Sequence, residues 1–186
     1  VWDRVASIQA LKEPLDSGDA KAVSEQLQLA WEQMSKAGLA LPFARGMAEE
    51  ILSLEALASD PLALRLGLLA DDYEGVALEA TSVPKELEFA RSIALGEPGE
   101  APEEALCQAI SAAFATPAPP LPQALTALLD EQRLGEALLA ALKSLSHGGD
   151  TDPAELSGAL AFLRAIGLED TARRVALQIL LLDTPT

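Results

Sequence analysis

Apolar side chains recur at helical spacing along almost the whole chain, and this periodicity limits the possible fold more than any other feature. Val23, Leu27 and Met34 lie on one face of a helix, and Leu106 and Ile110 repeat the spacing later. Leu and Ala, both strong helix formers, supply roughly 70 of the 186 residues, and no run of alternating β-branched residues interrupts the pattern. The sequence therefore predicts an all-α chain.

Prolines, aspartates and glycines mark where these helices begin and end. Pro61 and Pro153 occupy first-turn positions, where a missing N–H costs nothing, and Asp60 and Asp152 precede them as N-caps. Glycines such as Gly167 fit helix C-termini, where the backbone becomes left-handed. We expect about eleven helices, over residues 2–12, 19–37, 42–58, 61–70, 73–80, 84–95, 102–115, 122–132, 134–146, 153–166 and 169–182.

Three helical hairpins, within residues 64–80, 125–142 and 160–177, share one outline. Each has an apolar helix, a tight turn, one large apolar residue and then a small one, namely Tyr73 with Ala77, Leu134 with Ala137, and Leu168 with Ala172. This outline resembles the units of tetratricopeptide-like repeat proteins over about half of the chain, although the Trp and Gly-Tyr positions of that repeat do not recur. The resemblance implies a short irregular solenoid of stacked antiparallel hairpins; a compact helical bundle is the alternative.

A proline-rich segment interrupts a stretch without charged side chains that runs from Ala105 to Leu129. The stretch is long enough to cross a bilayer, but four prolines within residues 116–122 remove backbone donors and exclude one continuous helix. We therefore expect no membrane span. We expect instead a semi-rigid spacer at 116–122, between an N-terminal helical region, residues 1–115, and a C-terminal one, residues 123–186, packed on it.

Composition excludes several kinds of site. The chain has 29 acidic and 13 basic residues, a net charge of −16, which disfavours unassisted binding to nucleic acids or anionic lipid. A single cysteine and a single histidine exclude a disulfide framework within the chain and a zinc site of the usual Cys/His kind. We expect Cys107 to act as a small buried apolar residue. We expect His147, which follows a helix, to interact with the negative end of the helix dipole.

Motifs for phosphates and cations are also missing, so we expect no cofactor. The sequence contains neither a P-loop nor a dinucleotide-binding glycine pattern, and Asp150, Asp152 and Glu155 lack the spacing of a calcium loop. Paired carboxylates need no motif. A carboxylate-only hydrolase, or the helical accessory domain of a larger enzyme such as a cell-wall-acting one, therefore stays open as the alternative to a non-enzymatic chain.

Acidic charge is concentrated between Asp71 and Glu104, where ten acidic and two basic residues give a net charge of −8 in 34 positions. A solvated face explains such a cluster, and so does a docking surface for a basic partner segment. For the second explanation, Asp71, Asp72, Tyr73 and Glu74 are the candidate partner-binding residues. A smaller basic group, Arg164, Arg173 and Arg174, is expected to pair with Glu169 or Asp170 or to cap helices.

The expected function is a protein–protein interaction or scaffolding module that holds a peptide or partner helix on an exposed solenoid face. Few lysines together with abundant Ala, Leu and Pro are typical of GC-rich bacterial genomes. Since the chain starts at Val1, we expect a fragment or a processed product, in the cytoplasm or, after removal of a signal sequence, in the periplasm. The last helix, apolar on more than one face over residues 175–182, is expected to be covered.

Overall fold

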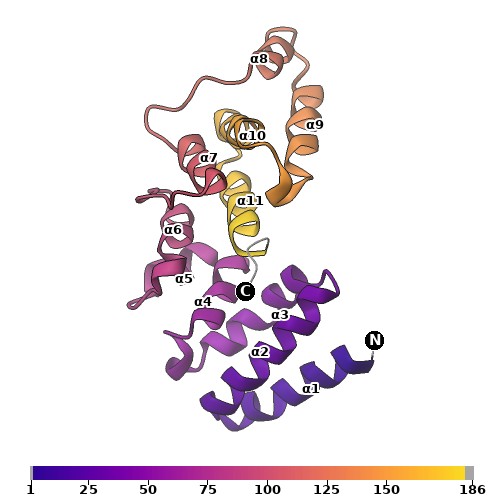
Figure 1. Cartoon of the computed structure of the whole chain (residues 1–186), viewed down its shortest axis with the longest axis vertical. Coiled ribbons are helices and arrows are strands. Elements are labelled where there is room, and N and C mark those ends of the chain that lie inside the picture. Colours follow the sequence, from indigo (N-terminus) through magenta and orange to yellow (C-terminus); the bar gives the residue numbers. More distant parts are fainter. Residues whose placement is uncertain (1, 183–186) are drawn as a thin grey trace. The chain divides into compact units, whose positions relative to one another are not determined.

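The computed structural model describes residues 2–182, and every regular element among them is helical (Figure 1). The prediction of an all-α chain with about eleven helices is confirmed. Two short 3-10 helices accompany them. In order, the elements are α1 (Trp2–Ser17), α2 (Ala20–Lys36), α3 (Ala40–Leu52), η1 (Glu55–Leu57), α4 (Pro61–Leu69), α5 (Tyr73–Glu79), α6 (Lys85–Ala94), α7 (Ala105–Ala113), α8 (Gln123–Asp130), α9 (Leu134–Leu145), η2 (Gly148–Asp150), α10 (Pro153–Ala165) and α11 (Glu169–Leu182).

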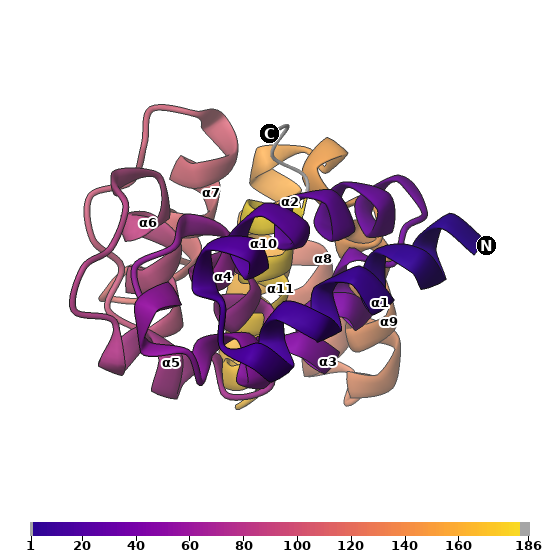
Figure 2. The ribbon, with the colours of Figure 1, turned by 90° about the horizontal axis from the view of Figure 1, so that it is seen from below.

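The chain divides into two compact units, residues 1–91 and 92–186, and the boundary falls inside α6. In the first unit α1 packs on α2, α2 on α3, and α3 on α4; Figure 2 shows α1, α2 and α3 along their lengths. In the second unit α10 is the central helix, since α7, α9 and α11 all pack on it (Figure 1). Each unit therefore has its own core.

This boundary differs from the one expected at the prolines, because residues 116–122 lie inside the second unit. Both ends of the proline-rich segment are held by α10. Arg164 donates from Nη1 to the carbonyl oxygen of Ala113 at 2.6 Å, and Gly158 lies so close to Pro122 that a Cβ there would collide with the proline ring. The segment is thus a strap across α10 and not a spacer between two bodies.

Four connections between described helices use the same αα-turn. In each, a residue with positive φ is followed by one whose N–H returns to a carbonyl five positions back, which is the Schellman arrangement. The carbonyl of that following residue then accepts the first bonds of the next helix. One residue therefore closes one helix and opens the next, which makes the hairpins tight. The positive-φ residues are Gly18, Gly38, Gln132 and Gly167.

The small residues of the three similar hairpins lie at helix contacts, as their outline predicts. Ala77, Ala137 and Ala172 are fully buried. The large residues before them differ, because Tyr73 is buried whereas Leu134 is half exposed. Close approach at alanine is therefore the feature that the hairpins share.

Two predicted boundaries were wrong for local reasons. The first helix continues through Pro14, which is buried beside Leu11 and Leu15, so packing offsets the backbone hydrogen bond that proline removes. The helix α3 ends at Leu52, because the Ser53 hydroxyl donates to the carbonyl oxygen of Glu50 at 2.6 Å and competes with the helical pattern.

The last helix is largely covered within its own unit, as expected. Five of its residues are buried, and it packs on α10. Within the described residues, no helix is both long and apolar enough to cross a membrane, and the charge-free stretch from Ala105 to Leu129 is divided between α7 and α8.

The predicted pairing of the basic group is confirmed, and it includes helix capping. The Glu169 carboxylate at the start of α11 contacts two guanidinium groups, with Oε2 2.8 Å from Arg164 Nε and Oε1 3.5 Å from Arg173 Nε. Arg164 also bonds the end of α7, and Arg173 Nη1 donates to the carbonyl oxygen of Ala94 at the end of α6. One carboxylate therefore holds two arginines that each satisfy the C-terminus of another helix.

The two αα-turns of the second unit predict opposite effects of substitution. Gln132 has a φ of 59° without being glycine, so Gln132→Gly should raise the free energy of unfolding by about 0.5–1 kcal/mol. Gly167, with a φ of 86°, has open space around it, so Gly167→Ala should lower that free energy by about 1 kcal/mol through backbone strain alone. Urea denaturation measures both, and equal effects of the two substitutions would contradict the shared turn geometry.

The shared carboxylate predicts a second difference in stability. Glu169→Gln should lower the free energy of unfolding by about 1–2 kcal/mol, because charge-assisted bonds to two partly buried arginines weaken together. Asp170→Asn is the matched control in the same helical turn. The Asp170 carboxylate, paired with Arg174, is more exposed than that of Glu169, so the loss should stay below about 0.5 kcal/mol. A larger loss for Asp170→Asn in thermal denaturation would rule out the network.

Candidate functional site

The four predicted partner-binding residues lie at the turn between α4 and α5, and they have different roles. Asp72 caps α5 by accepting a hydrogen bond from the Gly75 N–H at 3.3 Å, and Tyr73 is only 2% exposed. The Asp71 carboxylate is exposed and lies 3.6 Å from Arg45 Nε, and Glu74 faces solvent in the first turn of α5. Asp71, Asp72 and Glu74 are therefore exposed, with Asp72 engaged as the cap, whereas the Tyr73 ring belongs to the core.

The acidic segment does not form one surface within either unit. Six of its ten acidic residues precede the boundary at residues 91 and 92, and four follow it. Each unit by itself therefore carries only part of the charge cluster that the sequence suggests.

The other titratable candidates have structural surroundings. Burial, and to a lesser degree Glu104, raises the pKa of the Cys107 thiol, which disfavours the reactive thiolate. The Nδ1 atom of His147 lies 3.4 Å from the carbonyl oxygen of Ser144, at the end of α9. Asp152 caps α10 through the N–H groups of Ala154 and Glu155, as expected. Among the described residues, no group of His, Cys, Asp and Glu side chains is arranged to hold a metal ion.

In the described part of the chain, Thr151 is the only buried polar residue. No pair of carboxylates is therefore buried there. Carboxylates that act as general acids usually need burial or a nearby like charge to raise their pKa. The carboxylate-only hydrolase therefore has no geometric support among the described residues.

Helix α9 exposes three of its leucines and buries two of its alanines. Ala137 and Ala141 are buried against the neighbouring helices, whereas Leu134, Leu139 and Leu142 are 50%, 68% and 42% exposed. Exposed leucines are unremarkable one at a time, but three on one short helix form a continuous apolar face. We call this surface the α9 face.

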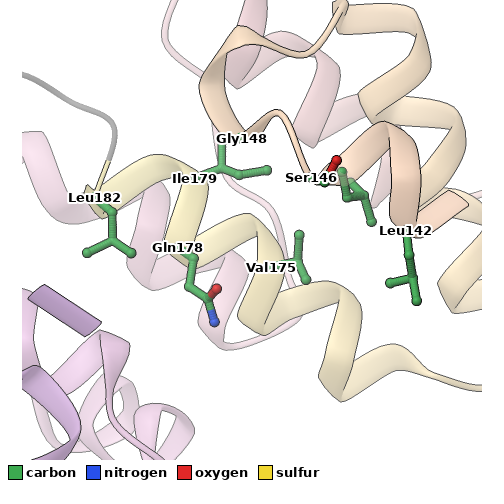
Figure 3. Close-up of a pocket in the computed structure, with 8 residues that line it drawn as sticks. Leu142, Ser146, Gly148, Val175, Gln178, Ile179 and Leu182 are labelled. Atoms are coloured by element: carbon green, nitrogen blue, oxygen red, sulfur yellow. The ribbon is translucent and has the colours of Figure 1, made fainter. Parts of the chain in front are cut away.

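A shallow groove of about 330 Å³ continues the α9 face toward α11 (Figure 3). Figure 3 shows Leu142 on one side and Val175, Gln178 and Leu182 on the other. Ser146 and Gln178 add polar groups to a lining that is otherwise mostly apolar, and the groove is open to solvent along its length. A shallow, open groove fits the apolar side of an elongated protein segment. A small molecule usually binds in a more enclosed pocket. The lining residues are Leu142, Leu145, Ser146, Gly148, Val175, Gln178, Ile179 and Leu182.

A small charge cluster stands at the N-terminal end of α9. Arg133 donates from Nε to Glu136 and from Nη1 to Glu131, each at 2.7 Å. The bonds to Glu136 and then Glu131 raise the pKa of Arg133, and the Arg133 bond lowers the pKa of Glu136, so both stay charged near neutral pH. With two carboxylates and one guanidinium, this triad has a net charge of −1.

Sequence reasoning missed this surface, because it assigned the leucines of residues 134–146 to a core-facing stripe. Of the stripe formed by Leu138, Leu142 and Leu145, only Leu145 is buried. The available signal was the number of leucines, since Leu134, Leu138, Leu142 and Leu145 follow one helical stripe and Leu139 does not fit on it.

No family model matches the chain, and neither a curated protein nor a solved structure is significantly similar to it. The activity of this chain has therefore to be inferred from its own residues.

The capping role of Asp72 predicts how the acidic candidates respond to substitution. Asp72→Ala should lower the free energy of unfolding by about 1 kcal/mol, because the N-cap of α5 is lost. Asp72→Asn removes the charge but keeps an accepting oxygen, so stability should change by only about a few tenths of a kcal/mol. Thermal denaturation of both variants tests this, and equal losses would show that charge, not capping, is what matters at Asp72.

Proposed function

We propose that this chain is a non-enzymatic protein–protein interaction module that holds the apolar side of a partner helix along α9 and α11. The supporting observation is that α9 buries Ala137 and Ala141, whereas its Leu134, Leu139 and Leu142 are exposed. Apolar faces of this kind, next to a groove, are typical of docking surfaces. The recurrent αα-turn supports a framework of stacked hairpins, as in tetratricopeptide-like proteins.

A helix laid into the groove would contact two helices at once. Side chains of a partner at positions i, i+3 or i+4, and i+7 would meet Leu142 and Leu145 on one side and Val175 and Ile179 on the other. Ser146 and Gln178 at the edge would accept or donate hydrogen bonds to polar groups of the partner. The partner that fits is an amphipathic helix of a few turns.

The net charge of the second unit favours some partner helices over others. Residues 92–186 contain 13 acidic and 5 basic side chains, a net charge of −8. A negative potential of this size speeds the approach of a cationic partner and slows that of an anionic one. We therefore propose a basic polar side for the partner helix.

A model peptide tests the proposal directly. A synthetic amphipathic helix with leucines on one side and lysines on the other should perturb the NMR methyl signals of Leu142, Val175 and Ile179 on titration. A peptide of the same composition, scrambled so that it has no apolar side, should leave those signals unchanged. Perturbations of backbone amide signals confined to residues 71–74 would favour the acidic turn instead, and the absence of any methyl or amide perturbation would contradict both surfaces.

A matched pair of variants distinguishes binding in the groove from nonspecific binding to exposed apolar side chains. Leu142→Glu should weaken binding of the leucine–lysine peptide at least about tenfold, because a charge enters the apolar lining. Leu78→Glu on α5 alters an exposed leucine far along the chain, and it should leave the affinity unchanged. Circular dichroism confirms that both variants remain folded.

A further inference from the structure

The α9 face is complementary to a second copy of itself. We propose that two copies of this chain associate through their α9 helices, which lie antiparallel about a twofold axis near Leu139. The inference rests on the proposed function, since the surface is the same, and it names a second copy as the occupant. In such an isologous dimer each contact occurs twice, so a weak match is doubled.

The register follows from the positions of the charged side chains. Between Leu134 and Leu145, the only charged residues of α9 are Glu136 and Lys143, which lie about two turns apart on one side of the helix. An antiparallel pair centred between Leu139 and Ala140 brings Glu136 of one copy level with Lys143 of the other. Each Glu136 then lies opposite Lys143 of the other copy, so the same ion pair forms twice.

The Arg133 triad strengthens this match. Glu136 is bound to Arg133, which also binds Glu131, so Lys143 of the second copy would approach a cluster of net charge −1. These side chains are about half exposed and accessible to a second copy. The pairing therefore brings one positive charge to one net negative charge at each end of the interface.

Apolar contacts follow in the same register. Leu139 of each copy would lie at the twofold axis, where its 68% exposed side chain becomes covered. Leu142, which is 42% exposed, lies one turn from Leu139 on the same side of the helix, next to this contact. The most exposed leucine of α9 would thus be covered by its own counterpart.

Charge balance also explains why this face and not another would meet a second copy. The whole chain has a net charge of −16, so two copies repel each other over most of their surface. Residues 131–146 contain two acidic and two basic side chains, and this balance removes the repulsion locally. A helix of 12 residues is about 18 Å long, which gives a small interface and a Kd of about micromolar or weaker.

Sedimentation equilibrium over a wide range of concentrations tests the dimer. Wild type should pass from monomer to dimer, and Leu139→Glu should weaken the association at least about tenfold. Leu78→Glu is a closely matched control, because Leu78 is 67% exposed and Leu139 is 68% exposed. It should leave the dimer unchanged. A wild type that stays monomeric up to millimolar concentration overturns the dimer, whereas peptide binding to the groove would then still support the proposed function.

Cysteine cross-linking tests the register. In a Cys107→Ser background, Glu136→Cys combined with Lys143→Cys should give a dimer linked by disulfides between copies on mild oxidation. Within one helix these positions are about 10 Å apart, too far for a disulfide. Lys143→Cys alone should not cross-link, since the two copies of residue 143 lie at opposite ends of the pair. Efficient cross-linking of that single variant would overturn the antiparallel register.

Discussion

Close packing of helices at alanine is the constraint on which the second unit depends. Ala137 and Ala141 let α9 approach its neighbours, and these buried positions decide which side of the helix faces inward. Helices have only one inward side, so the leucines of α9 that do not share it are left outside. The apolar face and its groove are therefore consequences of how the helix packs.

Polar contacts hold the same unit at its helix ends. The Glu169 carboxylate orients Arg164 and Arg173, and each arginine satisfies carbonyls where another helix stops. Helices as short as α7 have a large share of unsatisfied termini, so capping from a neighbour matters more to them than to long helices. The proline-rich strap across α10 is held by the same contacts and by Pro122 against Gly158.

Acidic charge and apolar surface have complementary consequences for association. The negative charge spread over both units keeps a chain rich in leucine from aggregating indiscriminately. The α9 face is where charges balance and leucines are exposed, and it is the surface that we propose for specific contacts. A basic amphipathic helix and a second copy would compete for this surface, which would make binding depend on the concentration of the chain.

The helices and most of their ends could be predicted from the residues, because apolar periodicity, Asp60, Asp152 and Gly167 act locally. The Arg–Glu pairing could be predicted too, since its members lie within ten positions. The α9 face could not, because Leu and Ala both favour a helix and the pattern does not say which of them faces the neighbours. That choice, like the boundary inside α6 and the burial of Tyr73, depends on contacts between segments far apart in the chain.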